Sequence, residues 1–236
     1  MRLTRVLLAE FIGTYFLCST IALAAGQAQL LAPLAIGAVL MAMVFAFGHV
    51  SGAHFNPAVT LAVLLRGGNK ISVGDAALYW AAQLCGAFAA AGVQQAGLGL
   101  PCMNPKDTAG MAHDAAVMAM CGSGYPMRNP KYSVGFAVIT ELTYTFALAS
   151  VVLHVATTKA NDGNSFFGLA IGFTVCAAAV AAGGVSGGAF NPAVGTALPA
   201  VHGHAKDIWI YWVGPLVGAA LAGLVFRVTN DEDDDE

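Results

Sequence analysis

Two asparagines, each followed by Pro-Ala, are the residues whose type and spacing most clearly suggest chemistry. They lie in nearly identical segments, SGAHFNPAV from Ser51 and SGGAFNPAV from Ser186. Asparagine is a strong helix N-cap, and proline suits the first helical position, where its missing N–H is not needed. Each copy therefore predicts the start of a short helix. The motif residues are Asn56, Pro57 and Ala58 in the first copy and Asn191, Pro192 and Ala193 in the second.

The two helix starts would form a polar site if the short helices enter a membrane from opposite faces. Their N-termini would then meet near mid-depth, each with free N–H groups and about half a positive charge. The carbonyl of each asparagine caps its own helix, which leaves the amide NH₂ as a donor. Two such donors would bind the oxygen of a small neutral molecule, and the helix ends would repel cations. The unwound Ser-Gly lead-in needs partners for its carbonyls, and we expect a file of water to supply them.

Two glutamates in apolar surroundings form a second pair. Glu10 lies in AEFIGTYFL and Glu141 in TELTYTFAL, and each is followed by threonine four residues later. Buried charges in a membrane are expensive and mark functional sites by default, so a proton relay is one interpretation. The other is structural: each carboxylate accepts hydrogen bonds from the unwound backbone that leads into a half-helix. The symmetry of the pair favours the structural interpretation.

The elements that must position these residues are six apolar stretches, each long enough to cross a bilayer as a helix of about 20 residues. We expect an all-α membrane protein with six transmembrane helices and two re-entrant half-helices. The predicted spans are Val6–Ala25, Leu31–Phe47, Asp75–Gly97, Val134–Ala156, Phe166–Gly183 and Ile208–Val228.

Two shorter segments, His49–Leu65 and Val185–Val201, are apolar but interrupted by glycine, asparagine and proline. Such segments at matching places in two halves indicate a binding or conduction site at mid-depth. The sequence therefore predicts one channel domain over 1–236, built from repeats at about 1–110 and 130–230. Three spans per half is an odd number, so the second repeat must be inverted.

The composition supports a membrane protein, because 58% of residues are hydrophobic and 10% are charged, whereas soluble domains carry about 25% charge. Apart from the acidic tail at 231–236, which we expect to be solvated, nothing indicates an excess of charge or nucleic-acid binding. No nucleophile–base cluster or phosphate loop suggests an enzyme. The five cysteines lack metal-ligand spacing, so no cofactor or metal is expected. Cys102 and Cys121 share one polar loop and could pair in an oxidising compartment.

The sequence closely resembles the aquaporin (major intrinsic protein) family. The resemblance covers nearly the whole chain and rests on AEFIGT, HVSGAHFNPAVT, GGAFNPAV and YWVGPLVGAALAG. It implies a homotetramer with one pore per subunit, lined at its centre by Asn56 and Asn191. It also implies pore backbone or lining at His54, where we expect a backbone carbonyl, and at Gly52 and Gly187. Val194 after the second motif resembles the vacuolar, intracellular branch, so the expected location is a vacuole-type organelle or the plasma membrane.

The same resemblance assigns a selectivity filter whose four residues are uncharged and apolar. Without the usual arginine and histidine, the ring should be wider than in strict water channels. Gly195 and the Tyr211–Trp212 pair nevertheless resemble water channels rather than glycerol facilitators. We therefore expect a passive channel for water, with ammonia, urea or hydrogen peroxide as further solutes and glycerol a poor one. The alternatives are a broader neutral-solute or glycerol facilitator, an ion-coupled transporter and an adhesive membrane protein. The filter positions are Ile36, Ala179, Gly188 and Val194.

Overall fold

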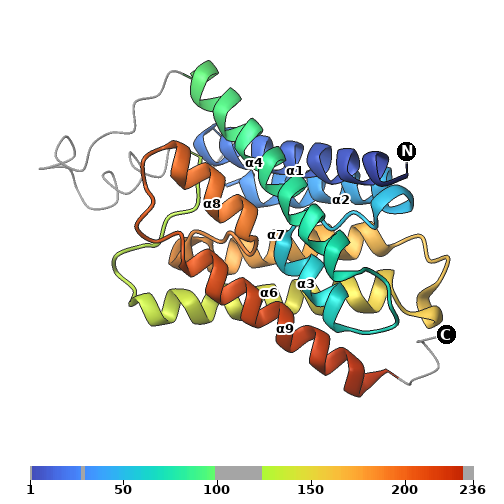
Figure 1. Ribbon diagram of the computed structural model, residues 1–236. Helices are drawn as coiled ribbons and strands as arrows, with labels where there is room; N and C mark the ends of the chain where they lie inside the picture. The colour runs from blue at the N-terminus through green and yellow to red at the C-terminus, as the bar shows by residue number, and fades with distance from the viewer. Residues whose placement is uncertain (1, 28–29, 99–123, 231–236) are drawn as a thin grey trace, which may run out of the picture.

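The computed structural model describes residues 2–27, 30–98 and 124–230, and this part of the chain is helical with no strand (Figure 1). Six of its helices are long and apolar enough to cross a membrane, which confirms the predicted fold class. The long helices are α1 Arg2–Gln27, α2 Ala32–Ser51, α4 Val73–Leu98, α6 Val134–Ala156, α7 Phe167–Ser186 and α9 Ile210–Thr229. The short ones are α3 Pro57–Leu65, α8 Pro192–Val201 and one 3-10 turn, Lys159–Asn161.

Glycines set the close contacts between the long helices. A Cβ atom added to Gly86 of α4 would collide with the Phe11 carbonyl of α1, and one added to Gly218 of α9 would collide with the Leu142 carbonyl of α6. At Gly214, an added Cβ would lie 2.7 Å from the Cβ of Glu141. The Gly214–Gly218 pair of α9 therefore packs closely against α6. Small residues let membrane helices approach until their backbones touch.

The ends of the long helices differ by up to four residues from the predicted spans, except in α6, where they agree. Helix α2 continues past Phe47 to Ser51 and stops where Gly52 takes a left-handed φ of 84°. Helix α8 contains Pro199 and ends at Val201, the end of the predicted short segment. Proline removes a donor but keeps its acceptor, and the Pro199 carbonyl accepts a hydrogen bond from the His204 backbone at 2.9 Å. The last turn of α8 is therefore held despite the proline.

The two short helices lie among the long ones and begin at the centre of the molecule (Figure 1). Helix α3 packs on α4, α6 and α9, and α8 packs on α4, α9 and α1. Their N-terminal ends face one another, while their C-terminal ends lead to opposite sides of the helical bundle. The two half-helix starts and the lead-in segments before them therefore lie together inside the bundle of long helices.

Candidate functional site

Each asparagine of the repeated motif caps its own half-helix, as predicted. The Asn56 side-chain oxygen accepts from the Ala58 backbone N–H at 2.8 Å, and the Asn191 oxygen accepts from the Ala193 N–H at 2.9 Å. Both asparagines have extended backbone, with φ of −157° and −155°, and proline follows at the first helical position. This geometry satisfies one of the free N–H groups of each helix start. The two N-termini, with their partial positive charges, are thereby fixed at the centre of the molecule.

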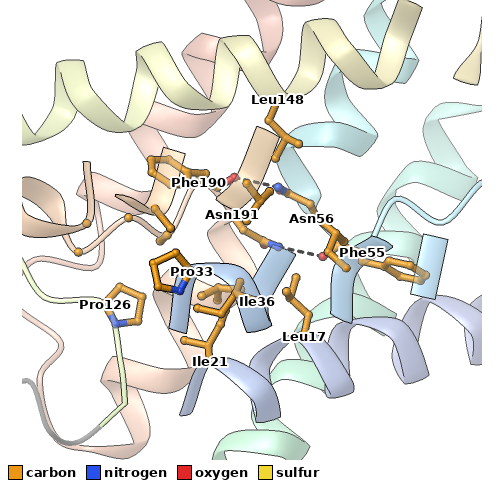
Figure 2. A pocket seen from close by; sticks show the side chains of 18 of the residues that line it. Leu17, Ile21, Pro33, Ile36, Phe55, Asn56, Pro126, Leu148, Phe190 and Asn191 are labelled. Carbon is orange, nitrogen blue, oxygen red and sulfur yellow. Dashed lines mark hydrogen bonds between the residues drawn. The ribbon is translucent and has the colours of Figure 1, made fainter. Parts of the chain in front are cut away.

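The same two side chains also join the half-helices to each other. The Asn56 amide nitrogen donates to the Phe190 carbonyl at 2.8 Å, and the Asn191 amide nitrogen donates to the Phe55 carbonyl at 2.9 Å (Figure 2). Sequence reasoning missed this reciprocal pair and assigned the amides wholly to a permeating molecule. Because an amide NH₂ has two protons, the bond to the opposite carbonyl uses one donor of each asparagine and fixes the orientation of its side chain.

Glu10 is fully buried in α1 and holds the first lead-in segment. One carboxylate oxygen accepts from the Ser51 hydroxyl at 2.6 Å and the His54 backbone N–H at 3.0 Å. The other accepts from the Phe55 N–H at 2.7 Å and the Gln83 amide at 2.8 Å. A carboxylate that accepts several charge-assisted bonds is a strong anchor. These contacts agree with the structural interpretation of this residue.

Glu141 is also fully buried and makes the corresponding contacts in the second half. It accepts from the Ser186 hydroxyl at 2.7 Å and from the backbone N–H groups of Ala189 at 3.0 Å and Phe190 at 2.7 Å. The lead-ins that both glutamates hold contain residues in the left-handed region, with φ of 49° at both Phe55 and Phe190. Non-glycine residues adopt this conformation only where the surroundings impose it.

Protein side chains satisfy several lead-in carbonyls for which the sequence suggested water. The Tyr79 hydroxyl donates to the Ser51 carbonyl at 2.6 Å, and the Tyr211 hydroxyl donates to the Ser186 carbonyl at 2.7 Å. The asparagine amides satisfy two further carbonyls, as described above. Protein groups therefore hold the first and last carbonyls of each lead-in segment, those of Ser51 and Phe55 in one half and of Ser186 and Phe190 in the other.

A cavity of about 340 Å³, here called the α8-side cavity, opens beside the asparagines (Figure 2). Its wall is mainly aliphatic and includes Leu17, Ile21 and Leu148, and no Asp, Glu, Lys or Arg of the described residues lines it. Both asparagines line it, together with Gly187 and the short segment from Tyr125 to Met127. The structure brings all four residues assigned to the filter into this one wall: Ile36, Ala179, Gly188 and Val194.

A second cavity of about 740 Å³, the α3-side cavity, lies toward the opposite end of the molecule and is more polar. It is lined by Gly52, His49, Lys70 and the turn at 157–164. Gly52 thus faces this cavity rather than the one with the filter residues. Three residues, His54, Val152 and Ile171, line both cavities. They mark the place where the two spaces adjoin.

The cysteines and the acidic tail are the remaining residues to which the sequence drew attention. Cys102, Cys121 and the acidic tail at 231–236 lie outside the described residues. The described cysteines, Cys18, Cys85 and Cys176, are free thiols. Within the described ranges, no three His, Cys, Asp or Glu side chains group as metal ligands.

Fold and site together define a multi-pass integral membrane protein with two half-helices that meet at paired asparagines. A model of the Major intrinsic protein family matches residues 1–226, and the chain belongs to this family. It is 34% identical to glycerol uptake facilitator protein-like 6 of Lactiplantibacillus plantarum over 97% of this chain and 100% of that one. It is 35% identical to the lens fiber major intrinsic protein of Lithobates pipiens over 94% of this chain and 80% of that one.

Human aquaporin-4 is 34% identical over 84% of this chain, and the match spans 56% of the length of that relative. The X-ray structure of the aquaglyceroporin from Plasmodium falciparum superposes with a TM-score of 0.78 over 99% of both chains, at 22% sequence identity. That superposition shows the shared fold. The related chains thus include proteins named for water and proteins named for glycerol.

Proposed function

We propose that this protein is a passive transmembrane water channel that also passes small neutral solutes such as ammonia, urea or hydrogen peroxide. The observation that carries the proposal is the pair Asn56 and Asn191, which line an aliphatic cavity while each keeps one amide proton for a passing oxygen. A molecule beside the two asparagines has left most of its hydrogen-bond partners behind in bulk water, and these two donors replace them. Two positive helix ends at the same point oppose cations.

Exclusion of protons follows from the same geometry. A water that accepts from both asparagines has its protons turned away from them, toward the two cavities. Waters on either side are then oriented in opposite senses, so no continuous donor-to-acceptor chain crosses the centre. Because the filter positions carry no cation, the asparagines and helix ends supply most of this exclusion.

The filter residues support water and small solutes over polyols. Two of the four, Ala179 and Gly188, are small, so the ring offers more room than an aromatic and arginine-lined ring. None of the four side chains offers a hydrogen bond, however, and a polyol would leave several hydroxyl groups without partners there. A broader neutral-solute or glycerol facilitator is the second candidate, favoured by the full-length match to the glycerol uptake facilitator-like protein of Lactiplantibacillus plantarum.

The proposal includes a homotetramer with one passage per subunit, two inverted repeats at about 1–110 and 130–230, and residence in a vacuole-type organelle or the plasma membrane. Exposed apolar side chains on the long helices, such as Leu8, Val93 and Phe173, fit contact with lipid or a neighbouring subunit. Transport down a gradient needs no catalytic residue and no cofactor, so no enzymatic role is proposed.

Stopped-flow light scattering on purified protein in liposomes tests the function. Vesicles with protein should shrink faster than empty vesicles under a sucrose gradient, with urea entering measurably and glycerol slowly. Flux that saturates or depends on an ion gradient would indicate a transporter instead. Shrinkage no faster than in empty vesicles would contradict the water channel, and rapid glycerol entry would favour the facilitator.

A further inference from the structure

Three residues line both cavities, and none of them is a filter position. His54 comes from the lead-in before α3, Val152 from α6 and Ile171 from α7. Their exposed fractions are 9%, 7% and 5%, so each side chain is almost wholly covered. We call this set the His54 ring. Two of its members are branched aliphatic side chains, and the histidine is its one polar member.

A chain of hydrogen bonds holds the histidine in place. The Gln83 amide nitrogen donates to Glu10 at 2.8 Å and to the Thr60 hydroxyl at 3.0 Å. The Thr60 hydroxyl oxygen lies 3.1 Å from His54 Nδ1. The Tyr79 ring packs on the imidazole at a centroid distance of 5.0 Å. Thr60 therefore holds the imidazole at its Nδ1 edge, and Tyr79 packs against it. The Nε2 edge of the imidazole is left toward the cavities.

The same bonds select which ring nitrogen carries the proton. A threonine hydroxyl has one proton and two acceptor sites. The Thr60 hydroxyl donates its proton to the Asn56 carbonyl at 3.1 Å and accepts from Gln83. Its second acceptor site is then filled by a proton on His54 Nδ1, which leaves Nε2 as an acceptor. Nε2 lies at the Gly52 side, because a Cβ added to Gly52 would come within 3.2 Å of it.

We propose that the His54 ring is a second solute-selecting constriction of the passage. Val152 and Ile171 limit the size of the solute, and His54 Nε2 accepts one hydrogen bond from it. The ring selects small neutral hydrogen-bond donors, such as water and hydrogen peroxide, over polyols. Thr60 and Gln83 are positioning residues that orient the imidazole. The inference rests on the proposed channel function. It adds a reason for slow glycerol passage, which the size of the wide filter does not explain.

Liposome flux of two ring variants tests the constriction. His54→Ala and Val152→Ala each remove bulk from a different side of the ring, so urea and glycerol permeability should rise several-fold relative to water permeability in both. Val151→Ala is the matched control, since it makes the same change one residue earlier on α6 and lines neither cavity. Its flux ratios should equal those of the wild type.

The outcomes separate the two proposals. A conducting wild type with unchanged ratios in both ring variants, or an equal rise in Val151→Ala, would overturn the His54 ring alone. Wild-type vesicles no faster than empty ones would overturn the water channel itself, and the role of the ring with it.

The positioning role needs a readout other than flux. Nitrogen-15 NMR of histidine-labelled protein in lipid, with the His54 signals assigned by their loss in His54→Gln, should show a protonated Nδ1 and an unprotonated Nε2. Thr60→Val should disturb this tautomer and Thr60→Ser should restore it. Thr174→Val is the control, because Thr174 only donates to the Ala170 carbonyl of its own helix. A protonated Nε2 in the wild type, or a tautomer unaffected by Thr60→Val, would overturn the positioning role.

Discussion

Glu10 in the first half and Glu141 in the second anchor their lead-ins in the same way but differ in one partner. Each accepts from a serine hydroxyl and from two consecutive backbone N–H groups. Glu10 also accepts from Gln83 of α4. In α9, Pro215 stands where Gln83 stands in α4, four residues after the tyrosine that binds the serine carbonyl. Both halves thus contain the glutamate anchor, but only the glutamate of the first half binds a glutamine side chain.

The difference continues along the half-helices. Thr60, four residues after Asn56, passes the Gln83 contact to the histidine, whereas the residue four after Asn191 is Gly195. A Cβ at Gly195 would collide with the Tyr211 side chain, so a threonine has no room there. The serine, tyrosine and glutamate contacts that fix the half-helices are the same in both halves, while the positions of Gln83 and Thr60 are occupied by Pro215 and Gly195 in the second half. One end of the passage is therefore apolar and the other holds a polar constriction.

The largest effect is expected when the carboxylates become amides. Glu141→Gln replaces one carboxylate oxygen with an NH₂ group, so in either amide orientation a buried donor that now binds Glu141 faces another donor. Each stranded buried group costs about 1–3 kcal/mol. In Glu10→Gln, the Gln83 amide can turn its oxygen, which has no partner in the structure, toward the new NH₂. Both variants should lose folded yield, measured by fluorescence-detected size exclusion and thermal melting, and Glu141→Gln should lose more.

Per-molecule permeability of the remaining folded Glu141→Gln and Glu10→Gln protein should change less than the yield. Normal yield with abolished permeability would restore the proton-relay interpretation of the glutamates. An equal loss in both variants would contradict the compensating role of Gln83.

A second pair of substitutions tests whether the framework is equally tight in both halves. Gly86→Ala in α4 and Gly218→Ala in α9 would each push a methyl group into a facing backbone carbonyl. Overpacking of this kind destabilises by about 1–3 kcal/mol, and we expect matched falls in melting temperature. Gly92→Ala in α4 is the control, because its Cβ would meet no atom within 4 Å. A fall in one variant only would show that the halves are not equally packed.

The sequence predicted most of the framework and less of the site. Span lengths and the half-helix starts follow from hydrophobic runs and from Asn-Pro capping, which act locally, so α6 was predicted at its observed bounds. The asparagine-to-carbonyl bonds could not be predicted from local rules. They join Asn56 to Phe190 and Asn191 to Phe55 across 134 and 136 positions.

The His54 ring was missed for the same reason. His54, Val152 and Ile171 come from three elements, and no spacing connects them. The expectation for His54 concerned its backbone carbonyl, whereas the structure directs attention to its side chain. A signal was nevertheless present: Gln83 and Thr60 are polar residues in apolar segments, and their counterparts in the second half are not polar.

The asparagines offer a comparison in which the halves should behave alike. Asn56→Asp and Asn191→Asp each remove a donor to the opposite carbonyl and add negative charge between two positive helix ends. Cation leak across liposomes, measured with a pH-sensitive dye, should rise to a similar extent in both. Asn129→Asp, in a residue that lines neither cavity, should leave the leak unchanged. If either motif variant is folded and its water and ion conductance are unchanged, the proposed role of that asparagine is wrong.

The smallest effect, a shift in solute selection, is expected from Val194→Arg, which also tests the difference between the two ends most sharply. Val194 lines the α8-side cavity beside both asparagines. An arginine there adds volume and five donors to a ring that now has no polar side chain, so the apolar end becomes polar and cationic. Urea and peroxide flux should fall more than water flux, because a narrower ring excludes the larger solutes first.

Val194→Leu separates bulk from charge in this test. It should also reduce urea flux relative to water, but only the arginine should further lower the cation leak of an Asn191→Asp background. Stopped-flow scattering measures the flux of urea, peroxide and glycerol, and the dye assay measures the cation leak. If Val194→Arg reduces the flux of all solutes equally, the cavity wall at Val194 does not select among them.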